Sequence, residues 1–236
     1  MSQFIIGFTG KIGVGKTTVS RMLSMYLNSM GYNTGLASFG DGLRFSMARD
    51  LNIPLGVLYD NSLKSKPIEV IPGHEDWMPY VDGCSATHGL KKTDLFRRVF
   101  QEYSQNGARL LNPDVWVDVL DERLKFMPNT IIVIDDIRQK NELEYCKERG
   151  VVFRITPYDG YESAGAHSHP VESAIDNEVE GINLLEIKGF GEQYLMRGVE
   201  QILFYIIQFF KEQEFNAVHH RLGMHQGQPL VGEQNG

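Results

Sequence analysis

The chain has 236 residues, of which 42% are hydrophobic, and it carries a formal net charge of −7. This length is enough for one α/β domain with an inserted segment and too short for two ordinary domains. An acidic chain lacks the basic face that phosphate neutralisation requires, which argues against a general nucleic-acid-binding protein. The two cysteines, Cys84 and Cys146, lie in no C-x-x-C motif, which is typical of free thiols in a reducing compartment.

The first half of the chain begins with a predicted buried strand at 4–8, which ends in glycine-rich sequence. A helix follows over 17–30, where apolar residues recur at helical spacing. A second short strand is predicted at 36–39, and a further helix reaches residue 48. Prolines and glycines then break any periodicity over 51–90, and we interpret this segment as an inserted substrate-binding lobe.

Periodicity returns in the second half with helices at 93–107 and at 112–126. The β-branched run 130–134 predicts a central strand, a helix follows at 141–149, and further strands are predicted at 151–155 and 184–187. Strands that alternate with helices predict an α/β three-layer sandwich, with a central parallel sheet and helices on both faces. We expect one domain of this type over 1–222.

Three segments near the carboxyl end have other properties. The polar segment 157–177 suggests a mobile lid, and the tail 223–236 is predicted to be disordered. The helix predicted at 192–214 is apolar nearly all round, which favours packing in the core or a homodimer. Charged and amide side chains interrupt its apolar stretch, so it is too polar to span a bilayer. No signal peptide is recognisable, and we expect a cytoplasmic protein with neither membrane nor nucleic acid as a partner.

The residues from Gly10 to Thr17 fit the phosphate-binding pattern G-x-x-x-x-G-K-[ST] between a predicted strand and a predicted helix. Glycines in this loop let backbone N–H groups turn inward around phosphate oxygens. The Lys16 ammonium is expected to reach the β and γ oxygens of ATP, and the Thr17 hydroxyl to bind Mg²⁺. The predicted nucleotide-binding residues are Gly10, Gly13, Val14, Gly15, Lys16, Thr17 and Thr18.

A second acidic group is needed to organise the Mg²⁺, and the strand at 130–134 ends in Asp135 and Asp136. Adjacent strand residues point to opposite faces, so only one of the two should face the cleft. We favour Asp136 and keep Asp135 as the second candidate. Arg138 follows two residues later, where its fork of donors could hold transferring phosphoryl oxygens.

Five stretches of the chain together resemble the phage deoxynucleoside monophosphate kinases, which belong to the nucleoside monophosphate kinase-like P-loop enzymes. They are 10–18, 38–44, 98–117, 135–142 and 169–172, and they occur in the order found in that family. The resemblance implies an ATP-dependent kinase that makes a deoxynucleoside diphosphate from the monophosphate, in the host cytoplasm if the source is viral. It also implies that Arg44, Arg109 and Arg138 hold phosphates and that Asp41 and Glu172 lie near the substrate.

Such a reaction needs no general base, because a monophosphate acceptor offers an oxygen that is already ionised. Lys16, Asp136 and Arg138 are then the residues expected to act on the transferred group. Two alternatives remain open. A kinase similar to dephospho-coenzyme A kinase would phosphorylate a hydroxyl group, with Asp41 as its base. A non-catalytic module would bind ATP without turnover.

Overall fold

The computed structural model describes residues 3–11, 13–89, 91, 93–157, 174–178, 180–187 and 191–224. Within this part, one sheet contains β1 (Phe4–Thr9), β2 (Thr34–Ala37), β3 (Ile131–Ile134), β4 (Gly150–Pro157) and β5 (Ile182–Ile187). The strand order is β2-β3-β1-β4-β5, and every neighbouring pair is parallel. The predicted α/β fold with a central parallel sheet is confirmed, and β1 lies at the centre of that sheet.

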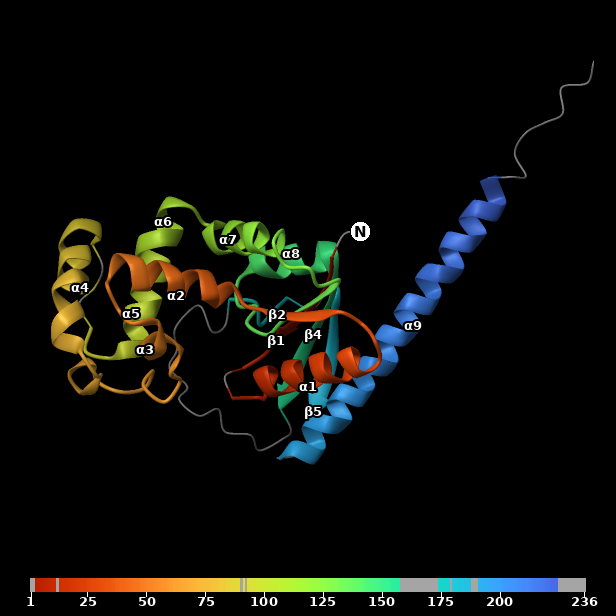
Figure 1. The fold of residues 1–236 in the computed structure, drawn as a ribbon, viewed down its shortest axis with the longest axis horizontal. Coiled ribbons are helices and arrows are strands. Elements are labelled where there is room, and N and C mark those ends of the chain that lie inside the picture. The colour runs from red at the N-terminus through yellow and green to blue at the C-terminus, as the bar shows by residue number, and fades with distance from the viewer. Residues whose placement is uncertain are drawn as a thin grey trace, which may run out of the picture.

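Helices cover both faces of the sheet (Figure 1). One face carries α1 (Lys16–Ser29) and α9 (Glu192–Met224), and the other carries α7 (Val115–Leu124) and α8 (Lys140–Arg149). Strand alternation explains this division, because successive side chains of β1 and β3 enter opposite apolar layers. Ile6 and Phe8 pack with α1 and α9, whereas Ile5 packs with α7 and α8.

The long helix α9 contributes to the core through only part of its surface. Val199, Ile202 and Ile206 are buried against the sheet, while Phe204 is 67% exposed. The homodimer expected from this helix therefore stays a prediction. None of the helices in the described ranges is both long enough and apolar enough to cross a membrane.

The chain between α2 (Phe39–Asp50) and α7 forms a group of helices that we call the helical lobe, defined as the described residues of 51–111. It lies beyond the sheet at the far end of α2 (Figure 1). Its elements are α3 (Leu55–Tyr59), a 3₁₀ turn (Ile68–Val70), α4 (His74–His88), α5 (Phe96–Glu102), a π-helical segment (Tyr103–Ala108) and α6 (Arg109–Leu111). Trp77 and Phe96 are fully buried in the same apolar cluster as Ile5, so the lobe and the sheet share one core.

The structure differs from the sequence predictions at one strand boundary and in one helix. The strand predicted at 36–39 is β2, which ends two residues earlier because Phe39 already begins α2. The segment 51–90 contains the regular 15-residue helix α4, although Pro79 lies inside it. A proline removes one helical hydrogen bond, but burial of Trp77 and Val81 on the inner side of α4 keeps the helix in place.

Candidate functional site

The loop between β1 and α1 has the positive-φ glycine backbone that the phosphate-binding pattern predicts. Gly10 has φ 138° and Gly15 has φ 92°, values in a region that side chains rarely allow. A Cβ atom at position 10 would lie 2.4 Å from the carbonyl oxygen of Ile155 in β4. The loop therefore requires glycine at its start, both for backbone shape and for its close approach to the neighbouring strand.

This loop forms one wall of a cleft of about 790 Å³. Gly13, Gly15, Lys16, Thr17 and Thr18 line the cleft, and Val14 is buried beneath it. The Lys16 ammonium donates hydrogen bonds to the carbonyl oxygens of Gly10 at 2.7 Å and Lys11 at 2.8 Å. It thus lies folded against its own loop, at the place where a bound triphosphate would offer competing acceptors.

Asp135 is the acidic residue that faces the loop. A hydrogen bond from Thr17 reaches its carboxylate, and Lys16 lies close enough to stabilise its charge. Burial, followed by repulsion from the neighbouring Asp136, nevertheless raises the pKa of Asp135 above its usual value. A carboxylate beside a hydroxyl is the hard-oxygen donor pair that suits Mg²⁺ held jointly with substrate phosphates.

Asp136, which we favoured from the sequence as the metal ligand, points instead toward the start of α2. Its carboxylate accepts hydrogen bonds from the Ser38 hydroxyl at 2.6 Å and from the backbone N–H groups of Phe39 at 2.9 Å and Gly40 at 2.8 Å. These bonds satisfy the first turn of α2, where a negative charge also complements the helix dipole. Asp136 thus fixes the start of α2 at the cleft, and Asp135 takes the position beside Thr17.

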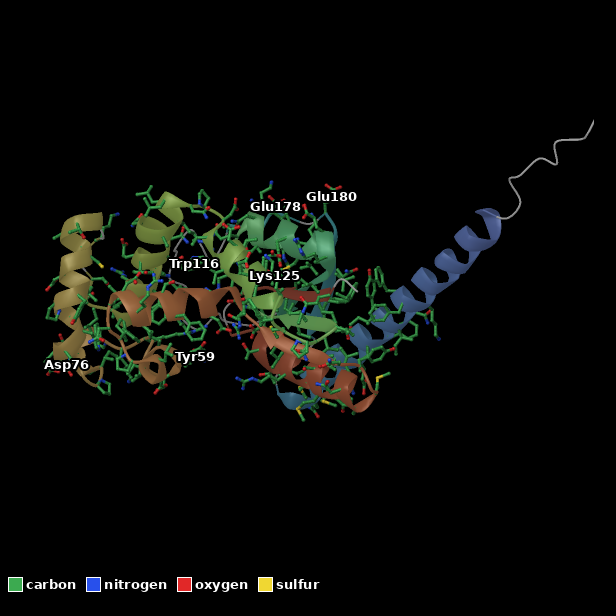
Figure 2. The ribbon with its side chains drawn as sticks, turned by 45° about the horizontal axis from the view of Figure 1, so that its top comes forward. Tyr59, Asp76, Trp116, Lys125, Glu178 and Glu180 are labelled. Carbon is green, nitrogen blue, oxygen red and sulfur yellow. The ribbon has the colours of Figure 1, made fainter. Side chains whose placement is uncertain are left out.

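Asp41 and Arg44, both on α2, lie in the cleft and bind each other. Arg44 forms an ion pair with Asp41 at 3.2 Å and stacks over the ring of Tyr59 at 4.8 Å. The Asp41 carboxylate also accepts hydrogen bonds from Arg123 at 2.5 Å and from the Tyr59 hydroxyl at 2.9 Å. Tyr59 lies beside α2, as Figure 2 shows. Three donors from α2, α3 and α7 therefore occupy Asp41.

Arg109, predicted to bind a phosphate, lines the cleft but also forms a buried ion pair. Its guanidinium donates to Glu142 at 2.5 Å and to the carbonyl of Pro113 at 3.1 Å. The second carboxylate oxygen of Glu142 accepts the backbone N–H groups of Arg138 at 2.8 Å and Gln139 at 3.0 Å. Arg109 thereby supports the start of α8, the turn from which Arg138 projects into the cleft.

The structure also brings in residues that sequence reasoning did not identify. Lys64, Arg97 and Phe100 from the helical lobe line the cleft. No sequence pattern marks Lys64 as a site residue, because a single lysine in an irregular segment cannot be distinguished from an ordinary surface lysine. Trp116 also lines the cleft, is 3% exposed, and donates its indole N–H to the Ser104 hydroxyl at 2.8 Å. It lies alongside α2 (Figure 2).

We call Arg44, Lys64, Arg97 and Arg138 the cation cluster. All four line the same cleft as the phosphate-binding loop. They come from three separate parts of the chain: α2, the helical lobe and the turn before α8. Glu172 and most of the predicted lid, 158–173, fall outside the described residues, as does the tail from residue 225.

A model of the adenylylsulphate kinase family matches residues 2–56, which contain the phosphate-binding loop and α2. The match covers less than a quarter of the chain, so it marks a segment similar to these kinases. No curated protein matches the sequence.

Solved structures with a similar arrangement are distant. A hexameric APS kinase from Thiobacillus denitrificans is 15% identical with a TM-score of 0.36, and the match covers 88% of this chain and 29% of that one. A gluconokinase from Sinorhizobium meliloti 1021 is 12% identical with a TM-score of 0.37, covering 89% and 98%. A plasmid partition protein from Borrelia burgdorferi is 13% identical with a TM-score of 0.40, covering 87% and 99%. At these identities and TM-scores, the similarities do not identify an acceptor for this chain.

Proposed function

We propose that the protein is an ATP-dependent kinase that transfers the γ-phosphoryl group of ATP to a deoxynucleoside monophosphate. The observation that carries this proposal is the cation cluster, which lines one cleft together with the phosphate-binding loop. Two phosphate-bearing ligands would each find fixed positive charge there, and arginine forks suit phosphoryl oxygens. The choice of a deoxynucleotide rests on the sequence resemblance.

Asp41 supports a phosphate acceptor over a hydroxyl acceptor. A kinase that acts on a hydroxyl group benefits from a carboxylate able to take the hydroxyl proton. Asp41 was the candidate for this role, and it is bound by Arg44, Arg123 and Tyr59. These three donors occupy the oxygens that would have to approach the hydroxyl group, whereas an ionised phosphate acceptor needs no base.

The transfer then depends on alignment and charge neutralisation. An oxygen of the acceptor phosphate forms a bond to the γ-phosphorus, and the bond from that phosphorus to the bridging oxygen breaks to release ADP. Lys16 would leave the carbonyl oxygens of its loop to bind phosphoryl oxygens. Arg138 would hold the transferred group, and Arg44 and Arg97 the acceptor. Thr17 and Asp135 fit a bound Mg²⁺, which would neutralise charge on the β and γ phosphates.

The test measures ADP release with a panel of acceptors: four deoxynucleoside monophosphates, the ribonucleotides, dephospho-coenzyme A and adenylylsulphate. We expect ADP with at least one deoxynucleoside monophosphate. Lys16→Ala should lower this rate about 10²- to 10³-fold, the scale on which one transition-state donor acts. Lys11→Ala is the matched control, because Lys11 is on the same loop but is 51% exposed and paired with Asp176.

Each remaining alternative has its own signature in this panel. ADP release with dephospho-coenzyme A or adenylylsulphate and with none of the monophosphates would refute the proposal in favour of a hydroxyl acceptor. The match of residues 2–56 to adenylylsulphate kinases is the reason to include the latter compound. ATP binding without ADP release on any acceptor would identify a non-catalytic module.

A further inference from the structure

Lys64 is held in the cleft by backbone pairing between two segments of the helical lobe. The Lys64 carbonyl accepts the N–H of Arg97 at 2.9 Å, and the Lys66 carbonyl accepts the N–H of Phe96 at 3.1 Å. A β-bridge between Pro67 and Leu95 continues this pairing. Since the main chain joins positions 64 and 97, their two cationic side chains enter the cleft as a fixed pair.

Positively charged side chains surround the Lys64 ammonium. Among the described residues, no carboxylate lies within ion-pair distance of its ammonium, which instead lies over the ring of Phe100 at 5.6 Å. Arg44, Arg97 and Arg138 are the charged groups that repel it, and Asp136 attracts it. The three arginines repel the Lys64 ammonium, and an anion bound beside Lys64 would offset that repulsion.

This environment acts on the charge of Lys64. Burial, followed by repulsion from Arg44, Arg138 and Arg97, lowers the pKa of Lys64 to about 8, whereas the attraction of Asp136 opposes the change only partly. The arginines stay charged at every relevant pH. The Tyr59 hydroxyl also faces the cleft, and burial and Asp41 raise its pKa further above neutrality. Lys64 is thus the cation in the cluster that can lose its charge.

We propose that Lys64 binds the phosphate of the acceptor and that one solvent proton is taken up on its Nζ atom as that anion enters. The proposal rests on the proposed function only in identifying the anion as the acceptor's phosphate. The proton balance is simple: a neutral amine, one proton from water and an anion become an ammonium–anion pair. Below neutral pH the Lys64 ammonium is already formed, and anion binding takes up no proton. As the pH rises past the pKa of Lys64 in the cleft without an anion, binding requires uptake of a proton and the anion affinity falls.

The experiment titrates sulfate into the protein by calorimetry, with ADP and Mg²⁺ saturating the phosphate-binding loop. Sulfate is chosen because it does not titrate between pH 7 and 9, so any linked proton belongs to the protein. We expect sulfate affinity to fall about tenfold from pH 7 to pH 9, as the charged fraction of a group with a pKa of about 8 does. At pH 8, buffers of different ionisation enthalpy should report about half a proton taken up per sulfate.

Three variants separate charge from structure. Lys64→Met should bind sulfate weakly at every pH, and Lys64→Arg should bind it with no pH dependence, because arginine stays charged. Lys66→Met is the matched control: Lys66 is exposed, lies two residues away and does not line the cleft, so wild-type affinity and slope should persist. The proposal is overturned if wild-type protein binds no sulfate, if its affinity is flat from pH 7 to 9, or if Lys64→Met keeps the slope.

These measurements involve no acceptor nucleotide and no turnover. A proton-linked anion site at Lys64 with no ADP release on the acceptor panel would leave the inference standing and refute the proposed function. Kinase activity on a monophosphate with flat sulfate binding would do the reverse.

Discussion

Replacing Arg109 with methionine should destabilise the fold by about 3 kcal/mol at neutral pH. Its partner Glu142 has a side chain only 3% exposed and would remain buried without its cation. Breaking a buried ion pair by removing one partner costs about 3–5 kcal/mol. We take the lower end because backbone N–H groups of Arg138 and Gln139 still bind the other Glu142 oxygen.

The loss of stability in Arg109→Met should also depend on pH, and the shift in the pKa of Glu142 determines in which direction. Burial raises the pKa of Glu142 above its usual value, and Arg109 opposes that shift. The folded protein therefore binds the Glu142 proton more tightly than the unfolded chain, and removal of Arg109 raises the folded pKa further. A raised acid pKa favours folding at low pH and disfavours it as the pH rises through the folded value. The difference between variant and wild type should thus be largest near neutral pH and shrink toward pH 5.

Urea denaturation at pH 7.5 and pH 5 measures both effects. For a chain of this length, 3 kcal/mol corresponds to a fall in melting temperature of about 6–12 °C. Arg49→Met is the matched control, since Arg49 is 75% exposed and pairs with the adjacent Asp50, an arrangement typically contributing under about 1 kcal/mol. The proposed support of α8 by Arg109 would be refuted if Arg109→Met lost no more stability than this control. It would also be refuted if the loss were equal at both pH values.

Three further outcomes follow from the structure. Asp135→Asn should weaken Mg²⁺-dependent nucleotide binding, measured by calorimetry, about tenfold or more. Asp136→Asn should mainly lower the free energy of unfolding, by about 1 kcal/mol, because Asp136 accepts hydrogen bonds from the first turn of α2. Equal effects of the two substitutions on Mg²⁺ dependence would contradict this assignment. Gly10→Ala should cost about 1–3 kcal/mol in urea denaturation, because its φ of 138° is strained for alanine and its Cβ would meet the backbone of β4. Buried Cys146, whose pKa is raised by burial, should react with a thiol reagent only after unfolding, well after half-buried Cys84; equal rates in native protein would contradict the core packing.

The sheet and its loop could be predicted from the sequence because their signals are local. An apolar run followed by a glycine pattern and a helical period defines β1, the loop and α1, since each depends on residues close together in the chain. The choice between Asp135 and Asp136 is not local. Ile131 and Val133 pack on the α1 side of the sheet, and Asp135 continues their alternation. Which face α1 covers is decided by tertiary packing.

The helical lobe was predicted least well, for a related physical reason. Helix α4 contains a proline, and it is held in position by burial of Trp77 against Phe96. These two residues are not close in the sequence. Lys64 and Arg97 become neighbours only through the backbone pairing of their segments. Pairing between irregular segments leaves no periodic trace, so a cation that matters cannot be told from a solvated one.

The π-helical segment Tyr103–Ala108 sets the rotational register of the helix that crosses the lobe. A π turn holds one residue more than an α turn, and each residue of an α-helix rotates the chain by about 100°. Deleting one residue from this segment would let α5 and α6 join as a regular α-helix. Because the wide turn takes up the additional residue, this deletion would leave Arg109 facing Glu142, whereas one residue more in a regular α-helix would turn Arg109 by about 100°. The π-helical segment therefore accommodates an additional residue in the helical lobe without breaking the contact between Arg109 and the start of α8.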